Sequence, residues 1–114
     1  MSELSEMSKI ELSIEAANEK IHLAKCLNKL MDNPEFQELI VDGYLKKDAV
    51  RLVKLKASPN ITNNANASAY LEGQLNAIAY LNQHFINIET EAAMAQKALE
   101  DAEAERDALY SEEN

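Results

Sequence analysis

Residues 67–109 contain no proline and a single glycine, and this run is the feature that most constrains the fold. A helix of that length rises about 1.5 Å per residue and spans roughly 65 Å. That exceeds the diameter of the small core that residues 13–57 can form, so we expect the first half to pack on the other helices and the second half to project. Apolar residues recur through it at the three- and four-residue steps of one helix face: Leu71, Leu75, Ile78, Leu81, Phe85, Ile88, Ala92, Ala95 and Leu99.

The apolar stripe of this helix changes along its length. Large side chains fill it as far as Ile88, and beyond that point it is mostly alanine in acidic surroundings. Alanine buries little area, so this half is weak as an isolated helix, and a bend near residues 89–91 is compatible with the sequence. We find no internal repeat and no sustained heptad, so a long parallel coiled coil is not expected.

The amino-terminal part predicts a second long helix. Residues 1–12 are rich in Ser and Glu and are expected to be irregular, with an extended piece near Ile10, and Ser13 is the expected cap of a helix that ends near Met31. This helix has two apolar faces, which are either both covered within one chain or divided between this chain and another subunit. One face holds Ile14, Ala17, Ile21, Ala24 and Met31, and the other Ala16, Leu23, Leu27 and Leu30.

Two short helices are expected to follow. Asn33 and Pro34 suit a helix start, and Gly43 can end that helix in the left-handed conformation. A further helix is predicted from Leu45 to Ala57, before a polar, Asn-rich loop at residues 58–66. Its buried stripe is expected to hold Leu45, Ala49, Leu52 and Val53.

These elements predict one all-α domain, a helical hairpin or small bundle with a long C-terminal helix and two short connecting helices. The low counts of glycine (2) and proline (2) agree, because sheets joined by tight turns need more of both. We divide the chain into a ragged segment (1–12), a helical core (13–88) and an acidic projecting helix end (89–114).

The chemistry of the side chains predicts binding rather than catalysis. His22 and Cys26 have ligand spacing, but two ligands make a poor metal site, and Gly-rich phosphate loops are absent. We therefore expect no enzymatic activity and no cofactor. The net charge of −9 disfavours direct nucleic-acid binding. A single cysteine, with no leader and no apolar run near the ~20 residues that span a bilayer, predicts a reducing cytoplasm and no membrane partner.

Two surfaces are candidate protein-binding sites. Lys47, Arg51 and Lys54 share one helix face, which can simply solubilise the helix, dock an acidic protein surface (the tail of another copy included) or contact nucleic acid. The acidic tail is either a solubilising helix end or an attachment helix, ordered by a partner or by self-association. Its stripe holds Ala92, Ala95, Leu99 and Ala102.

The segment from Pro34 to Pro59, PEFQELIVDGYLKKDAVRLVKLKASP, resembles a segment of small helical accessory proteins of tailed bacteriophages. The resemblance extends over roughly residues 14–105 and rests on packing motifs, so it carries over no functional residue. It implies a non-enzymatic structural or assembly protein that binds a larger virion protein, in the host cytoplasm during assembly and then in the virion. The alternative is a small acidic regulator or inhibitor of a basic, nucleic-acid-binding host protein.

Overall fold

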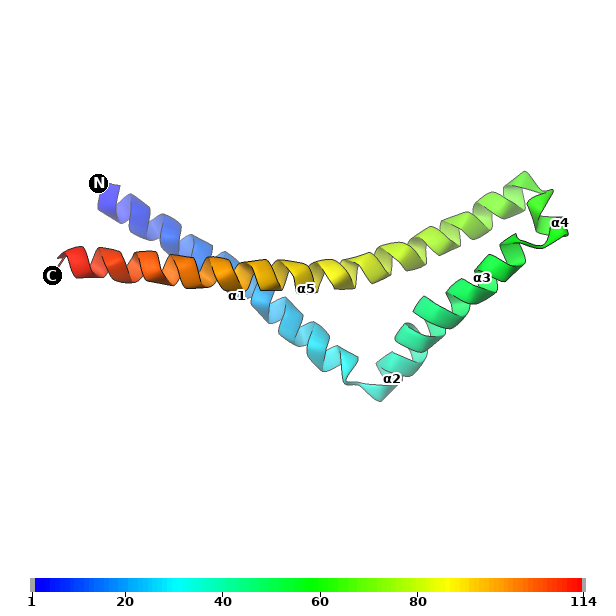
Figure 1. Ribbon diagram of the computed structural model, residues 1–114, viewed down its shortest axis with the longest axis horizontal. Helices are drawn as coiled ribbons and strands as arrows, with labels where there is room; N and C mark the ends of the chain where they lie inside the picture. Colours follow the sequence, from blue (N-terminus) through cyan, green and yellow to red (C-terminus); the bar gives the residue numbers. More distant parts are fainter. Residues whose placement is uncertain (1, 114) are drawn as a thin grey trace. The chain divides into compact units, whose positions relative to one another are not determined.

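The computed structural model describes residues 2–113, with side chains for residues 5–112, and confirms the all-α prediction: no strand occurs in this range. Two compact units form. Unit 1 holds the residues up to 27 together with those from 87 onward, and unit 2 holds residues 28–86. The helices, in chain order in Figure 1, are α1 (Ser2–Met31), α2 (Pro34–Phe36), the π-helix η1 (Gln37–Asp48), α3 (Ala49–Lys56), α4 (Pro59–Thr62) and α5 (Ala65–Glu113).

The long C-terminal helix is confirmed, and α5 is longer than predicted at both ends. No break interrupts α5 near residues 89–91, where the helix is continuous. Alanine, leucine, glutamate and glutamine, the strong helix formers, fill this stretch. Asn64 begins the helix, because its Oδ1 accepts a hydrogen bond from the backbone N–H of Ala67 at 3.1 Å.

The irregular segment expected at residues 1–12 is instead the start of α1, which is helical from Ser2; Met1 and Asn114 lie outside the described residues. Ser13 does not cap a helix. Its Oγ donates to the carbonyl oxygen of Lys9 at 3.0 Å, one turn earlier within α1. Ile10 is buried, so the apolar spacing continues through the supposed irregular segment and stabilises it as helix.

Unit 1 is an antiparallel pair of helices. Ile10 of α1 lines one groove with Leu109 of α5, and Ala17 lines another with Ala95, so the two chains run in opposite directions. Covered positions alternate at steps of three and four along both helices, which is the heptad spacing of a coiled coil. They are Met7, Ile10, Ile14, Ala17, Ile21 and Ala24 on α1, and Ile88, Ala92, Ala95, Leu99, Ala102, Arg106 and Leu109 on α5. Two further covered residues of unit 1, Leu27 and Glu103, depart from this alternation.

Two expectations are therefore wrong. A sustained heptad does exist, although it pairs the two ends of one chain in antiparallel fashion. The end of α5 does not project alone, because residues from 87 onward pack with α1. The heptad was missed because alanine or arginine occupies several of its positions, and the prediction relied on large apolar side chains.

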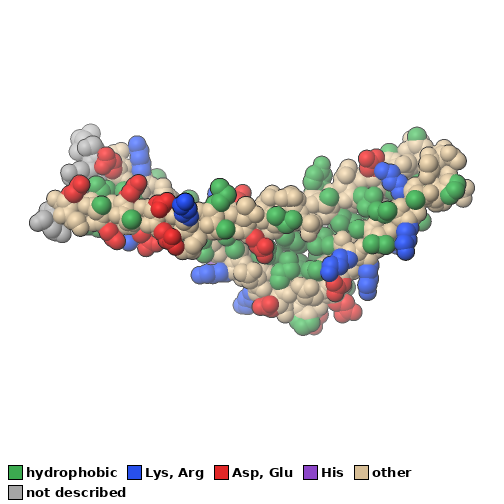
Figure 2. All heavy atoms as spheres, viewed as in Figure 1, with side chains coloured by type: hydrophobic (Ala, Val, Ile, Leu, Met, Phe, Trp, Pro, Cys, Tyr) green, Lys and Arg blue, Asp and Glu red, His purple; other side chains and the backbone are tan. Residues whose placement is uncertain are grey.

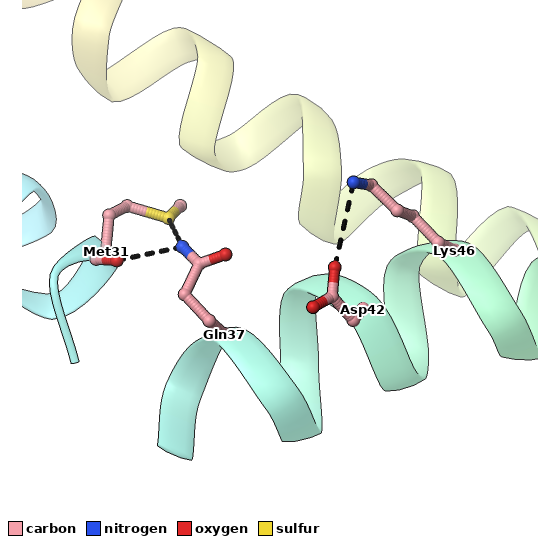
Figure 3. A network of polar contacts seen from close by, with 4 residues as sticks. All are labelled: Met31, Gln37, Asp42 and Lys46. Atoms are coloured by element: carbon pink, nitrogen blue, oxygen red, sulfur yellow. Dashed lines mark hydrogen bonds and ion pairs between the residues drawn. The ribbon is translucent and has the colours of Figure 1, made fainter. Parts of the chain in front are cut away.

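In unit 2, a short turn joins α1 to α2, and a side-chain hydrogen bond to the backbone stabilises it at each of the two helix ends. The prediction for Asn33 is confirmed: its Oδ1 accepts from the backbone N–H of Phe36 at 2.8 Å, with Pro34 in the first turn of α2. Gln37 reaches back to α1, where its Nε2 donates to the carbonyl oxygen of Met31 at 2.8 Å (Figure 3). Side chains thus satisfy backbone groups that the two helix ends leave free.

The helix predicted to stop at Gly43 does not stop. No described glycine has a positive φ, and residues 34–56 form one continuous helical run whose middle is η1. All residues from 40 to 45 are partly covered, as are Phe36 and Asp48. Tyr44, Leu45 and Ala49 pack against the cluster of Leu52, Leu71 and Ile78, so the run continues to face α5 past Gly43.

The core of unit 2 lies between this helical run and the first part of α5. Leu52 of α3 is only 1% exposed and clusters with Leu71 and Ile78 of α5. The loop expected at residues 58–66 contains α4, whose Ile61 packs on the cluster. The partly covered residues around the cluster are Tyr44, Leu45, Ala49, Ile61 and Leu75. Val53, expected in this stripe, instead lies on the exposed side of α3.

Candidate protein-binding surface

The side of α3 opposite Leu52 carries the predicted cations together with exposed valines. With Leu52 turned into the core, Val50 and Lys54 lie about half a turn away from it, and Arg51 and Val53 lie about 100° to either side. All four are exposed, as is Lys47, which lies one turn before Arg51 in η1. We call this set the basic outer face: Lys47, Val50, Arg51, Val53 and Lys54. Figure 2 shows Lys and Arg side chains along this part of unit 2.

The cations of the basic outer face differ in how they are paired. Arg51 Nε lies 3.0 Å from Asp48 Oδ1, so part of its charge is satisfied one turn away on its own helical run. Lys47 and Lys54 form no ion pair with any residue from Ser5 to Glu112. Their charges are therefore available to acidic groups of a partner.

The valines are the component that reasoning from charge spacing missed. Val50 is 53% exposed and Val53 is 56% exposed. Lys54 directly follows Val53 in α3, and Lys47 lies one turn before Val50, in η1. The two valines gain no burial energy in water, and a partner that covered them would gain it. The sequence held a signal, since Val50 follows Lys47 by three residues and Val53 directly precedes Lys54 within the run 46–56.

The second predicted surface is covered within the chain. Ala95 and Ala102 are buried, and Ala92 and Leu99 are half-buried, in the pairing of α5 with α1. The small side chains of the three alanines allow close approach of the two helices. These four residues belong to unit 1, whereas Lys47, Arg51 and Lys54 belong to unit 2.

The net charge of the chain lies entirely in unit 1. Residues 28–86 contain six acidic and six basic residues, whereas the rest of the chain contains fourteen acidic and five basic residues. Acidic side chains gather along the end of α5 in Figure 2. The basic outer face is therefore a local concentration of positive charge on a unit whose net charge is zero.

The described residues bring together no metal-ligating cluster. Cys26 Sγ and His22 Nε2 lie 3.5 Å apart on the exposed side of α1, but within the described part of the chain no group of three or more His, Cys, Asp or Glu side chains could hold a metal. None of the helices between residues 2 and 113 combines the length and apolar character that crossing a membrane requires.

Comparison with known proteins adds no assignment: no family model matches the chain, and no curated protein and no solved structure matches it.

Proposed function

We propose that this chain is a non-enzymatic bacteriophage structural or assembly protein that attaches to a larger virion protein through the basic outer face. The observation that carries the proposal is the exposure of Val50 and Val53 beside Lys47 and Lys54, which form no ion pair with the described residues. The segment that resembles phage accessory proteins, residues 34–59, contains this whole face. The protein acts in the host cytoplasm during assembly and then in the virion.

The face defines the chemistry of its partner. Covering the valines removes apolar area from water, worth about 25 cal/mol for each Å². The lysines favour a partner that surrounds an apolar strip with carboxylates, and they set its orientation. One side of a short helix is small compared with the roughly 800 Å² that each partner contributes to a stable complex. Attachment is therefore reinforced by several copies bound to one large protein.

Charge reversal tests this proposal in assembled particles. Lys47→Glu combined with Lys54→Glu keeps the helix and its core residue Leu52 while reversing the two available charges. We expect the variant to fold and to fall at least about tenfold in abundance in purified particles, measured by mass spectrometry against the major virion protein. The control, Lys9→Glu with Lys97→Glu, makes the same change of net charge in unit 1 and is expected to leave incorporation unchanged. Equal incorporation of all three proteins would reject the basic outer face.

One observation favours a second function. Because unit 1 carries the entire net charge, its acidic helix pair is suited to bind a basic, nucleic-acid-binding host protein as a regulator or inhibitor. Analysis of the same purified particles distinguishes the two functions. Absence of the chain from purified particles, together with its capture of a basic host protein that competes with nucleic acid, favours the regulator.

A further inference from the structure

The outer side of α1 carries a second apolar stripe that the pairing in unit 1 leaves open. Leu12 is 64% exposed and Leu23 is 53% exposed, and Ala16 and Cys26 are exposed on the same side of the helix. We call these four residues the α1 outer stripe. They fall at positions 12, 16, 23 and 26, so with Glu19 between them they repeat the three- and four-residue steps of a coiled-coil face.

The charges on the stretch of α1 that carries the outer stripe, residues 11–27, are divided between its two halves. Residues 11–19 contain Glu11, Glu15 and Glu19 and no cation, whereas residues 20–27 contain Lys20 and Lys25 and no acid. All five side chains are exposed. Laid antiparallel against a second copy of itself, the acidic half of one helix meets the basic half of the other. A parallel arrangement would place acids against acids and lysines against lysines.

We propose that the α1 outer stripe is the interface of a homodimer in which two copies of α1 pack antiparallel about a twofold axis near Lys20. Twofold symmetry requires a surface that complements itself. The division of charge meets that requirement away from the axis, where Glu15 of one copy lies level with Lys25 of the other. At the axis the two copies of Glu19 lie close together and weaken the association. An unrelated partner would have no need for this symmetry of charge. The proposal is independent of attachment through the basic outer face, which lies in unit 2.

The size of the stripe sets the expected affinity. About four helical turns from each copy bury less than the roughly 1,000 Å² typical of a stable interface, so the dimer is weak and forms at about 0.1–1 mM protein. Attachment of several copies to one large protein would raise the local concentration into this range. Sedimentation velocity over that concentration range measures the association directly, and a protein that stays monomeric at about 1 mM overturns the proposal.

The charges provide a test of direction that does not depend on packing. Glu15→Lys with Glu19→Lys leaves Glu11 as the one acid of residues 11–27, and Lys20→Glu with Lys25→Glu leaves that stretch without a cation. Each variant alone is expected to be at least about tenfold weaker in self-association than the unmodified chain, while an equimolar mixture associates at least as tightly as that chain. Circular dichroism checks that both variants remain helical. Self-association of the separate variants at the original strength contradicts the pairing of opposite charges.

Disulfide trapping tests the register. With the axis near Lys20, Cys26 of one copy lies about 18 Å along the helix from Cys26 of the other, too far for a disulfide. It lies instead level with residues 12–16 of the other copy. Oxidation of the unmodified chain is therefore expected to give no covalent dimer, whereas Leu12→Cys or Ala16→Cys gives one.

The control for trapping is Tyr80→Cys, an exposed position on α5 outside the stripe. It is expected to give no more covalent dimer than the unmodified chain. Efficient dimer formation through Cys26 alone would show a parallel arrangement and overturn the proposal. Trapping at position 80 that equals trapping at positions 12 and 16 would show that the crosslinks are not specific to the stripe, and would overturn it too.

Discussion

The ring of Phe36 meets the ring of Phe85 edge to face, with centroids 5.9 Å apart and planes at 72°. This contact joins α2 to α5 at the end of unit 2 opposite α4, where Lys56 Nζ lies 3.6 Å from Glu72 Oε2. Two contacts so far apart fix the run from Pro34 to Lys56 antiparallel to α5. The side of α3 that faces α5 is thereby determined, and so is the side that faces water.

The aromatic pair is expected to couple energetically. Phe36→Leu and Phe85→Leu keep apolar volume but remove the edge-to-face geometry, and the double variant should recover about 0.5–1.5 kcal/mol relative to the sum of the single changes. Urea denaturation of all four proteins measures this coupling. Additive losses would show that the rings act only through the area they bury.

Leu52 is expected to be the residue on which unit 2 depends most. Leu52→Ala leaves a cavity in the cluster with Leu71 and Ile78 and should lower the free energy of unfolding by about 2–5 kcal/mol. Val53→Ala, at the next position on the exposed side of α3, should change it by less than about 0.5 kcal/mol. Equal losses of stability for the two variants in urea denaturation would show that the buried side of α3 is wrongly assigned, and would reject the basic outer face.

The two glycines are expected to respond to alanine with opposite sign. A Cβ on Gly43 would lie 2.9 Å from the backbone carbonyl oxygen of Glu38, whereas one on Gly73 would have no heavy atom within 4 Å. Gly43→Ala must shift the backbone of η1 and should cost about 1–2 kcal/mol. Gly73→Ala should stabilise α5 by about 0.5–1 kcal/mol. Thermal melts compare the two, and stabilisation by both changes would show that η1 tolerates the added methyl group.

The alanines between α1 and α5 are expected to tolerate no larger side chain. Ala95→Leu forces a branched side chain into a buried position and should cost about 1–3 kcal/mol. Ala93→Leu adds the same atoms on the exposed side and should be neutral within about 0.5 kcal/mol. Hydrogen exchange at residues 90–105 reports the effect locally. Equal protection in both variants would mean that α5 does not need close contact with α1.

Local signals predicted local structure well. Asn33 and Pro34 identified a helix start because one side chain and one ring determine it, and the apolar spacing from Leu71 to Phe85 predicted the first half of α5. The pairing of the two chain ends was missed, because Ala92, Ala95 and Ala102 are as common on exposed faces as in close helix contacts. The helix end predicted at Gly43 was wrong for a related reason. Glycine is suited both to a left-handed helix end and to the narrow space of η1, and tertiary contacts decide which of the two structures forms.

The candidate surface was predicted in part. The spacing of Lys47, Arg51 and Lys54 placed them on one face, but the stripe assigned to the core included Val53. An α-helix from Leu45 onward places Leu52 and Val53 about 100° apart, so either could lie inward. Leu52 is the buried residue because it packs against Leu71 and Ile78 of α5. This contact between residues distant in the sequence leaves the two valines exposed.

Lysine-directed crosslinking in purified particles, read out by mass spectrometry, tests most directly whether the basic outer face is the attachment surface. The ammonium groups of Lys47 and Lys54 would lie at the contact, whereas Lys9 and Lys97 lie in unit 1. We predict crosslinks from Lys47 and Lys54 to one larger virion protein, at a yield clearly above that from Lys9 and Lys97. Crosslinks to that protein from Lys9 and Lys97 alone, or absence of the chain from the particles, would contradict the account.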